Sequence, residues 1–317
     1  MRVVLTGIAG RLGRRMALLL HEQGHHVIGI DKRPCLGLPE GIEHHRVDLR
    51  RRTAHDVFAA ARAEAVLHMG VVHNFRIPAE VLNARNVIGT DELLKLVIKF
   101  DVSKMVLLSS GDVYGPSAAN SHFIAEDAPL LASQRFPEVR TLVAVDRAVQ
   151  SFFWRYPDVH TAILRPAHIV GENVRNAPSN YLRLRVIPTQ MGFDPMVQLT
   201  READVCQALL RALDPSVRGV YNLASTQPVP LSHILRVLNR PVLPIPHPLF
   251  AGGLKRLWAW GLTSFPPPEL DHIRFSSVLD TRRAERELGV LTHAALKDVL
   301  APFVLPPAGG IPPTAPS

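Results

Sequence analysis

The sequence predicts an α/β protein in which a doubly wound parallel sheet carries a smaller C-terminal lobe. Short apolar runs alternate with segments of helical periodicity from the first residue to about residue 172, as is typical of strands joined by crossover helices. Beyond that point the alternation loosens, and Pro-rich connectors separate shorter elements. The chain has 317 residues, of which 47% are hydrophobic, which suffices for one large domain or for a large and a small one.

Each expected strand is a short apolar run bounded by turn-forming or polar residues. Six are expected in the first part of the chain: RVVLT (2–6), HVIGID (26–31), HHRVDL (44–49), AVLHMG (65–70), KMVLLSS (104–110) and HTAILRP (160–166). Helices are expected between them at 11–23, 53–63, 79–100 and 138–155. Because helices separate most of the strands, parallel pairing with helices on both faces is favoured.

The later part of the chain predicts a smaller unit. A helix is expected over 202–213 and a strand over GVYNLA, 219–224. We therefore expect a nucleotide-binding domain over 1–172 and a substrate-binding lobe over 173–301 that is interleaved with the sheet edge. The Pro/Gly-rich tail, 302–317, is expected to be disordered.

Composition limits the partners and the compartment. The formal net charge is +8, but most of the positive charge is Arg in short separate clusters, so nucleic-acid binding is not expected. Two cysteines give no disulfide framework, and no run of 18 apolar residues occurs, so a cytoplasmic protein is expected. Residues 248–262 have apolar residues at helical spacing; packing over the lobe or the substrate cleft is favoured there, with peripheral membrane contact left open. A homodimer is also left open.

A glycine-rich turn, LTGIAGRLG at 5–13, follows the first strand and opens the first helix. In such a turn Gly7 permits the tight bend, Gly10 lets a pyrophosphate approach the backbone, and Gly13 lets helix and strand pack closely. The pyrophosphate would rest on the N-terminus of the helix. That N-terminus is formed by Arg11, Leu12 and Gly13. The spacing therefore predicts a Rossmann-type dinucleotide site.

The second and third strands supply the rest of that site. Asp31 ends the second strand, where a carboxylate would take the ribose hydroxyls and repel a 2′-phosphate. Asp48 and Leu49 end the third strand, where the adenine edge would lie. Lys32 and Arg33 flank Asp31 and would favour a phosphate instead. We expect NAD, with NADP the less favoured alternative.

The motifs together resemble those of the extended short-chain dehydrogenase/reductases, the NAD-dependent epimerase/dehydratase family. The match runs in order over about residues 1–300: TGIAGRLG, Asp31, Asp48-Leu49, VLHMG (66–70), NVIGT (86–90), LLSSGDVYG (107–115), LRPAHIVG (164–171) and GVYNLA (219–224). The resemblance implies a small-molecule substrate such as a nucleotide sugar. It also implies an active-site hydroxyl at Ser110, a bracing role for Asn86, and cofactor contacts from Met69, Gly70, Val71, Ser109 and Pro166.

The chain departs from this family at its acid–base pair, a Tyr followed four residues later by a Lys. Leu142 and Asp146 stand at those positions, and none of the four tyrosines has a Lys four residues on. Beside Ser110, the candidate replacements are His168, since a His can exchange a proton near neutral pH, and Asp112. Tyr114 is a third candidate, for which a packing role is favoured. Two functions remain: an oxidoreductase or epimerase with a non-standard site, or a catalytically inactive NAD(H)-binding sensor.

No metal site is expected from the sequence. The histidines stand out only as two adjacent pairs, His25-His26 and His44-His45. Neighbouring residues on a strand point to opposite faces, so neither pair suits a single ion.

Overall fold

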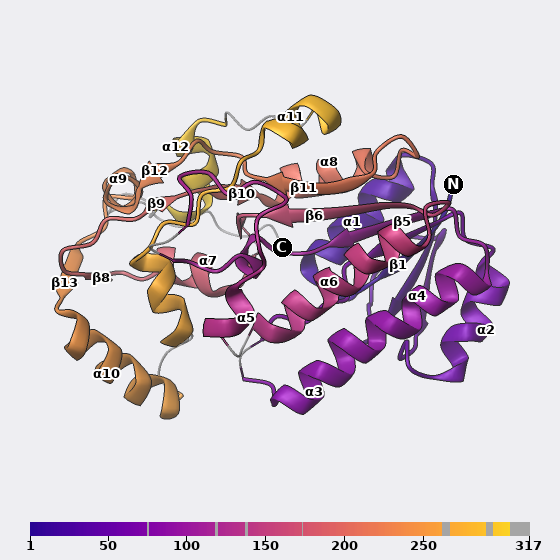
Figure 1. Ribbon diagram of the computed structural model, residues 1–317, viewed down its shortest axis with the longest axis horizontal. Coiled ribbons are helices and arrows are strands. Elements are labelled where there is room, and N and C mark those ends of the chain that lie inside the picture. Colours follow the sequence, from indigo (N-terminus) through magenta and orange to yellow (C-terminus); the bar gives the residue numbers. More distant parts are fainter. Residues whose placement is uncertain are drawn as a thin grey trace, which may run out of the picture.

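The structure is a computed structural model that describes residues 1–74, 76–117, 120–136, 139–172, 174–261, 267–289 and 294–304. Figure 1 shows the strands of the sheet running along the long axis of the molecule, with the lobe at one end of the sheet. Most of the expected disordered tail, from residue 305, and residue 262 of the apolar 248–262 segment lie outside the described residues.

The central sheet has seven strands, and every neighbouring pair is parallel. The strands are β1 (Arg2–Thr6), β2 (His26–Asp31), β3 (Ile42–Arg46), β4 (Ala65–His68), β5 (Lys104–Leu108), β6 (His160–Pro166) and β11 (Gly219–Leu223). Their order across the sheet is β11-β6-β5-β4-β1-β2-β3. The order reverses between β1 and β4, and ligands of such sheets bind at that point, beyond the carboxyl ends of the strands. The predicted fold class is confirmed.

Helices cover both faces of this sheet, and each face has its own apolar core. The helices are α1 (Arg11–Glu22), α2 (Arg52–Ala61), α3 (Ala79–Asn83), α4 (Gly89–Lys99), α5 (Ala132–Arg135), α6 (Arg140–Arg155), α8 (Glu202–Arg211) and α11 (Arg282–Leu288). One core joins α1 and α8 to the sheet through residues such as Met16 and Leu209. The other joins α2, α4 and α6 through residues such as Phe58, Val97 and Phe152 (Figure 1).

Two expected elements differ from those observed. The third strand is Ile42–Arg46 rather than 44–49, because the chain leaves the sheet after Arg46 and turns through Asp48 toward α2. The single helix expected over 79–100 is interrupted by a π-helical segment, Ala84–Ile88, between α3 and α4. Such segments insert an extra residue into the turn and often occur at functional sites; this one contains Asn86.

The lobe is built from short elements around a third apolar core. These elements are β7 (His168–Val170), α7 (Ala177–Leu182), β8 (Ile187–Gln190), β9 (Met196–Val197), β10 (Leu199–Arg201), β12 (Val229–Pro230), α9 (Leu231–Val237), β13 (Val242–Ile245), α10 (His247–Ala259), a 3-10 helix (Pro267–Ile273), α12 (Leu296–Leu300) and a 3-10 turn (Ala301–Phe303). The chain also returns to the main sheet here, since β11 pairs with β6. The boundary at residue 172 stays a prediction.

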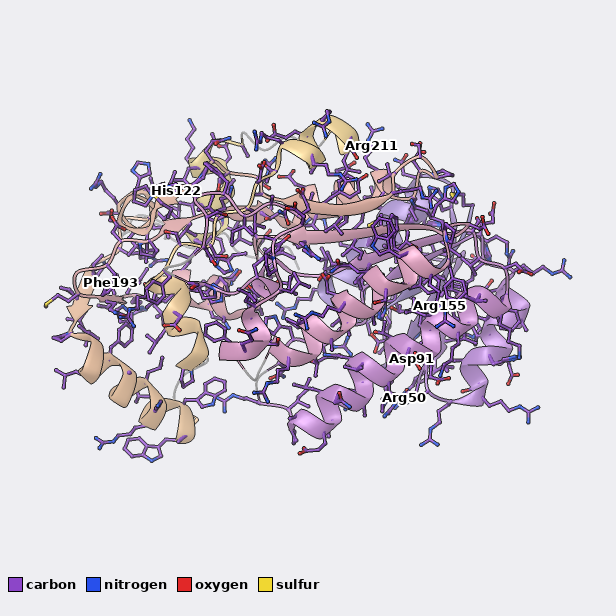
Figure 2. The ribbon with its side chains drawn as sticks, in the orientation of Figure 1. Arg50, Asp91, His122, Arg155, Phe193 and Arg211 are labelled. Carbon is purple, nitrogen blue, oxygen red and sulfur yellow. The ribbon has the colours of Figure 1, made fainter. Side chains whose placement is uncertain are left out.

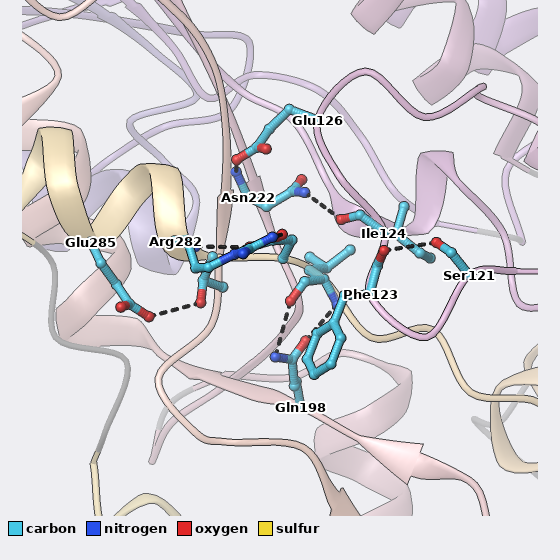
Figure 3. A network of polar contacts seen from close by, with 11 residues as sticks. Ser121, Phe123, Ile124, Glu126, Gln198, Asn222, Arg282 and Glu285 are labelled. Carbon is cyan, nitrogen blue, oxygen red and sulfur yellow. Dashed lines mark hydrogen bonds and ion pairs between the residues drawn. The ribbon is translucent and has the colours of Figure 1, made fainter.

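A polar network ties the lobe to the sheet (Figure 3). Asn222 of β11 donates from its side chain to the Ile124 carbonyl, and its backbone N–H donates to the Glu126 carboxylate. The Gln198 side chain pairs with both backbone groups of Leu279. Together with the backbone bridge between Ile124 and Leu279, these bonds join four segments that are apart in the sequence, and so fix the lobe beside the carboxyl ends of the strands.

The charged side chains are spread over the surface rather than gathered into one patch. Arg50, Arg155 and Arg211 lie on separate elements, and Asp91 stands on α4 (Figure 2). Arg50 is also paired with Asp48 at 2.7 Å. This dispersal supports the expectation against nucleic-acid binding, which stays a prediction. In the described part of the chain, no helix is both long and apolar enough to cross a bilayer.

Candidate functional site

The glycine turn is packed too tightly for side chains. Gly7 has φ +82°, and a Cβ there would lie 2.7 Å from the Met69 carbonyl oxygen. A Cβ on Gly13 would lie 2.2 Å from the Gly7 carbonyl oxygen, so the helix meets the strand through bare backbone. At Gly10 a Cβ would stand 3.1 Å from the same oxygen. The turn is therefore a backbone cradle at the N-terminus of α1, where free N–H groups favour an anion.

A cleft of about 560 Å³ lies over this cradle, at the point where the strand order reverses. Its shape and lining fit a dinucleotide: bare glycine backbone on one wall and carboxylates at the ends of β2 and β3. Most of the residues expected to contact the cofactor line it: Gly7, Gly10, Arg11, Leu12, Gly13, Asp31, Lys32, Asp48, Leu49, Met69, Gly70 and Val71.

Asp31 and its neighbours set the charge at the ribose end of the cleft. The Asp31 carboxylate accepts hydrogen bonds from the backbone N–H groups of Ala9 and Arg33 and from the Arg33 guanidinium. Burial raises the pKa of Asp31, but the hydrogen bonds from Arg33 outweigh it, so the pKa lies below its ordinary value. Lys32 pairs with Asp48 at 2.9 Å. Lys32 and Arg33, which both line this cleft, are thus each paired with a carboxylate.

Asn86 acts behind the cleft rather than in it. It is buried, its side-chain oxygen accepts from the Val72 N–H, and its amide donates to the Val72 carbonyl at 2.8 Å and to Thr141 at 3.1 Å. The interrupted helix thereby holds the loop after β4 against α6. His68 lies nearby and is fully buried between the Thr6 and Thr90 hydroxyls, and burial lowers its pKa to about 4.

A second cleft, of about 440 Å³, lies between the sheet and the lobe. It shares Met69, Val71, Asn74 and Leu108 with the first cleft, so the two clefts adjoin. Ser109, Ser110, Asp112, Leu142, Pro166 and His168 all line it. Ser109 and Pro166, expected at the cofactor, therefore line the second cleft and not the first. Trp258 of α10 also lines the second cleft, and the centroid of its ring lies 4.0 Å from Cζ of the Arg76 guanidinium.

Three of the predicted catalytic residues meet at the wall of this second cleft. The Ser110 hydroxyl donates to the Asp112 carboxylate at 2.9 Å, and His168 Nδ1 lies 4.0 Å from the same carboxylate. Two histidines missed by sequence reasoning join them: His73 Nδ1 at 3.9 Å and His272 Nε2 at 4.0 Å from Asp112. Burial raises the pKa of Asp112, but the surrounding histidines and the Ser110 hydroxyl lower it by more. The net pKa lies below the ordinary value, so the carboxylate is ionised.

Leu142 and Asp146 do not act as a Tyr–Lys pair would. Leu142 faces the second cleft with an apolar side chain. Asp146 is fully buried and is held by Arg165 through two hydrogen bonds of 2.9 and 2.7 Å. Ser109 and Gln150 also donate to it. The position expected to carry a cation near the ribose is therefore a carboxylate that neutralises a buried Arg.

Tyr114, in the loop after β5, belongs to the same buried network. Its hydroxyl accepts from Arg165 at 2.6 Å and donates to Asn222 at 2.8 Å, and burial raises its pKa to about 12. A phenol bound in this way is a packing group and is closed to a substrate. The only sequence sign of this network is Arg165 in a strand that otherwise reads as apolar; its partners come from helices and loops distant in the chain.

The cradle, the clefts at the switch point and the adjoining lobe define a dinucleotide-binding α/β protein with a separate substrate side. The model of the NAD dependent epimerase/dehydratase family matches residues 3–192. The chain belongs to that family.

Curated relatives agree with this assignment. An uncharacterized protein of Mycobacterium tuberculosis is 27% identical over 302 residues, which cover 90% of this chain and 79% of the relative. A UDP-glucose 4-epimerase of Dictyostelium discoideum is 28% identical over 221 residues, 62% of each chain.

Solved structures share the fold. The UDP-glucose 4-epimerase of Thermotoga maritima, crystallised with UDP-glucose, has a TM-score of 0.73 at 19% identity, over 96% of this chain and 97% of that one. The UDP-glucuronic acid 4-epimerase of Bacillus cereus, in complex with UDP-glucuronic acid and NAD, has a TM-score of 0.74 at 16% identity, over 96% and 98%. At these identities the likeness concerns the fold alone.

Proposed function

We propose that the chain is an NAD-dependent enzyme that acts on a hydroxyl group of a nucleotide sugar or a similar anionic substrate. The observation that carries this proposal is that the two clefts adjoin through four shared residues and that Ser110, Asp112 and His168 line the second of them. Bound NAD would accept or return a hydride at the substrate carbon. The family's members of known structure that bind UDP-sugars support the substrate class.

The chain's own residues supply the rest. Gly10 and the α1 N-terminus receive the pyrophosphate, and Asp31 receives the ribose hydroxyls. Arg76 and Arg175 line the substrate cleft, where cations suit a diphosphate. Ser110 and His168 face the substrate oxygen, with the Asp112 carboxylate between them. This polar group takes over the work of the absent Tyr–Lys pair, which Leu142 and Asp146 cannot do.

A panel of UDP-sugars tests this proposal, with product formation followed by NMR and cofactor reduction by absorbance. We expect turnover by the wild type and a loss of about 10²–10⁴-fold in kcat for His168→Gln and for Ser110→Ala, as for a lost proton-transfer or polarising group. His122→Gln is the matched control, because His122 is exposed on the surface (Figure 2). Tight NAD(H) binding without turnover on the whole panel would instead indicate an NAD(H)-binding regulatory protein.

A contact of α10 with an anionic membrane surface is a second, weaker proposal. Phe250 and Leu254 of this helix pack in the lobe core, as the sequence favoured. Leu249 and Trp260, however, are 69% and 70% exposed, and Lys255 and Arg256, which lie between them in the sequence, are exposed as well. An apolar side flanked by cations is the pattern of an interfacial helix.

A further inference from the structure

Three metal-ligating side chains converge at the wall of the substrate cleft from separate elements. Asp112 lies in a 3-10 turn, Gly111–Val113, after β5; His168 begins β7; and His272 lies in the 3-10 helix of the lobe. One donor atom from each lies within 4.8 Å of the other two. The two imidazole rings are 5.1 Å apart at 72°, so they meet edge to face and do not stack.

The spacing of these atoms is too long for direct hydrogen bonds and suits an ion between them. His168 Nδ1 and His272 Nε2 each lie 4.0 Å from Asp112 Oδ1, beyond the range of a hydrogen bond. An ion bound at about 2.0–2.2 Å keeps its ligand atoms roughly 3–4 Å apart. Small side-chain shifts would therefore bring all three into coordination.

The carboxylate is already oriented for that role. Ser110 donates to Oδ2 of Asp112 and also accepts from the Asp112 backbone N–H, so Oδ1 is left facing the two histidines. Metal-bound carboxylates are commonly fixed by such an outer hydrogen bond. Among the described residues the buried Nδ1 of His272 has no hydrogen-bond partner, so no hydrogen bond at that nitrogen fixes the orientation of the ring.

The donor set and the open side indicate the class of ion. Two imidazoles and one carboxylate suit Zn²⁺ and related transition metals better than Mg²⁺ or Ca²⁺, which prefer oxygen ligands alone. Asp112 and His168 both line the 440 Å³ cleft, so the cluster borders the substrate side. His73 lines the same cleft, and its Nδ1 lies 3.9 Å from the other carboxylate oxygen, Oδ2 of Asp112. Three protein ligands and one open position are the arrangement of catalytic zinc sites.

We propose that Asp112, His168 and His272 bind one divalent transition-metal ion of the zinc class, with its open position toward the substrate cleft. The ion places positive charge at the substrate oxygen and polarises that oxygen as a Lewis acid, in a site where Asp146 stands in place of the family's Lys. Under this assignment His168 gives a lone pair to the ion, not a proton to the substrate. The role toward the substrate rests on the proposed function, whereas the binding of the ion does not.

The test is a titration of the chelator-treated full chain with Zn²⁺ by calorimetry, and with Co²⁺ by visible absorption. We expect one equivalent to bind, with affinity lowered at least about 100-fold in His272→Ala and in His168→Ala. Ser110→Ala, which frees the carboxylate, is expected to lower it by about 10–100-fold. His122→Ala is the control and should bind like the wild type.

Three results would overturn the proposal. They are no binding by the wild type, binding by His168→Ala and His272→Ala as tight as that of the wild type, or an unchanged stoichiometry in the variant that combines His168→Ala with His272→Ala, which would place the ion on surface histidines. Asp112→Asn, close in shape to the native side chain, repeats the test should an alanine variant unfold. NAD(H) affinity measured on the same samples separates the two proposals. Metal binding without turnover contradicts only the proposed function, and turnover in a protein that binds no metal contradicts only the metal site.

Discussion

The buried pair between Asp146 and Arg165 makes a quantitative prediction. Both side chains are fully buried, and Asp146 is the only acidic side chain to which Arg165 donates among the described residues. Asp146→Asn keeps the shape and removes the charge. Breaking a buried pair by neutralising one partner costs about 3–5 kcal/mol, because the remaining charge is left uncompensated. We expect a loss of that size in the free energy of unfolding, and a fall in Tm of at least about 6 °C.

The assay is urea unfolding followed by circular dichroism, with calorimetry for Tm. Asp91→Asn is the matched control: Asp91 is also paired, with Lys95 at 2.7 Å, but lies exposed on α4, and exposed pairs contribute little. The control should be indistinguishable from the wild type. An Asp146→Asn protein within about 1 kcal/mol of the wild type would refute the reasoning, since a fully buried, two-fold hydrogen-bonded pair cannot be that weak to break.

The same geometry bears on attempts to restore the family's Tyr–Lys pair. Asp146→Lys would place a second cation beside the buried Arg165. Gln150 lies one helical turn on, and its amide is 2.7 Å from the Asp146 carboxylate, so a Glu there stands close to Arg165. We expect Leu142→Tyr with Asp146→Lys to fold poorly and the addition of Gln150→Glu to recover much of the lost stability. Equal stability of the two combinations would contradict this explanation.

Further predictions follow from the clefts, the buried imidazole and α10. Arg33→Ala removes the cation that neutralises Asp31, so the Asp31 carboxylate should repel the 2′-phosphate of NADP(H); like charges about 4 Å apart repel by on the order of 1–4 kcal/mol. Calorimetric titration should then show the affinity for NADP(H) weakened at least about tenfold relative to that for NAD(H). An unchanged ratio of the two affinities would contradict this role of Arg33. The folded pKa of His68 is about 4 through burial and the unfolded one is about 6.5, so the unfolded chain binds more protons between them and stability should fall by up to about 3 kcal/mol from pH 6.5 to 4. In urea titrations, His68→Gln should reduce this dependence of the free energy of unfolding on pH. An equally steep dependence in the variant and the wild type would refute the assignment of the effect to His68. If α10 contacts membranes, flotation of the protein with anionic liposomes should weaken as salt is added and in the variant that combines Leu249→Ala with Trp260→Ala. Flotation that neither the salt nor this variant changes would exclude α10 as the membrane contact.

Much of the fold was predictable because it follows from local pattern. The strand over 160–166 and the glycine turn were placed from apolar runs and spacing alone, since a buried parallel strand must be apolar and a turn packed against backbone must lack side chains. The break in the helix at Asn86 was not predictable. Its apolar periodicity continues through the π-helical segment, and the hydrogen bond that Asn86 makes there, to the Val72 N–H of the loop after β4, has no counterpart in a periodic pattern.

The candidate site was predictable only in part. Asp112 and His168 follow strand ends, where side chains of a parallel sheet gather, so both could be named from the sequence. His272 could not, because it is brought to them by the folding of the lobe and has no motif around it. The partner of Asp146 was also hidden, since helix periodicity places Asp146 on a buried face without saying which cation lies opposite.

Titration of the purified full chain with NAD(H) by calorimetry tests the central claim most directly. A Val at Gly10 would enter the path of the pyrophosphate, whereas one at Gly252, on α10, would have no atom within 4 Å of its Cβ. The account predicts one equivalent of NAD(H) bound by the wild type and by Gly252→Val, and affinity at least about tenfold weaker in Gly10→Val, with all three proteins folded. A wild type that binds no NAD(H), or a Gly10→Val variant that binds it as tightly, would contradict the assignment of the cofactor cleft.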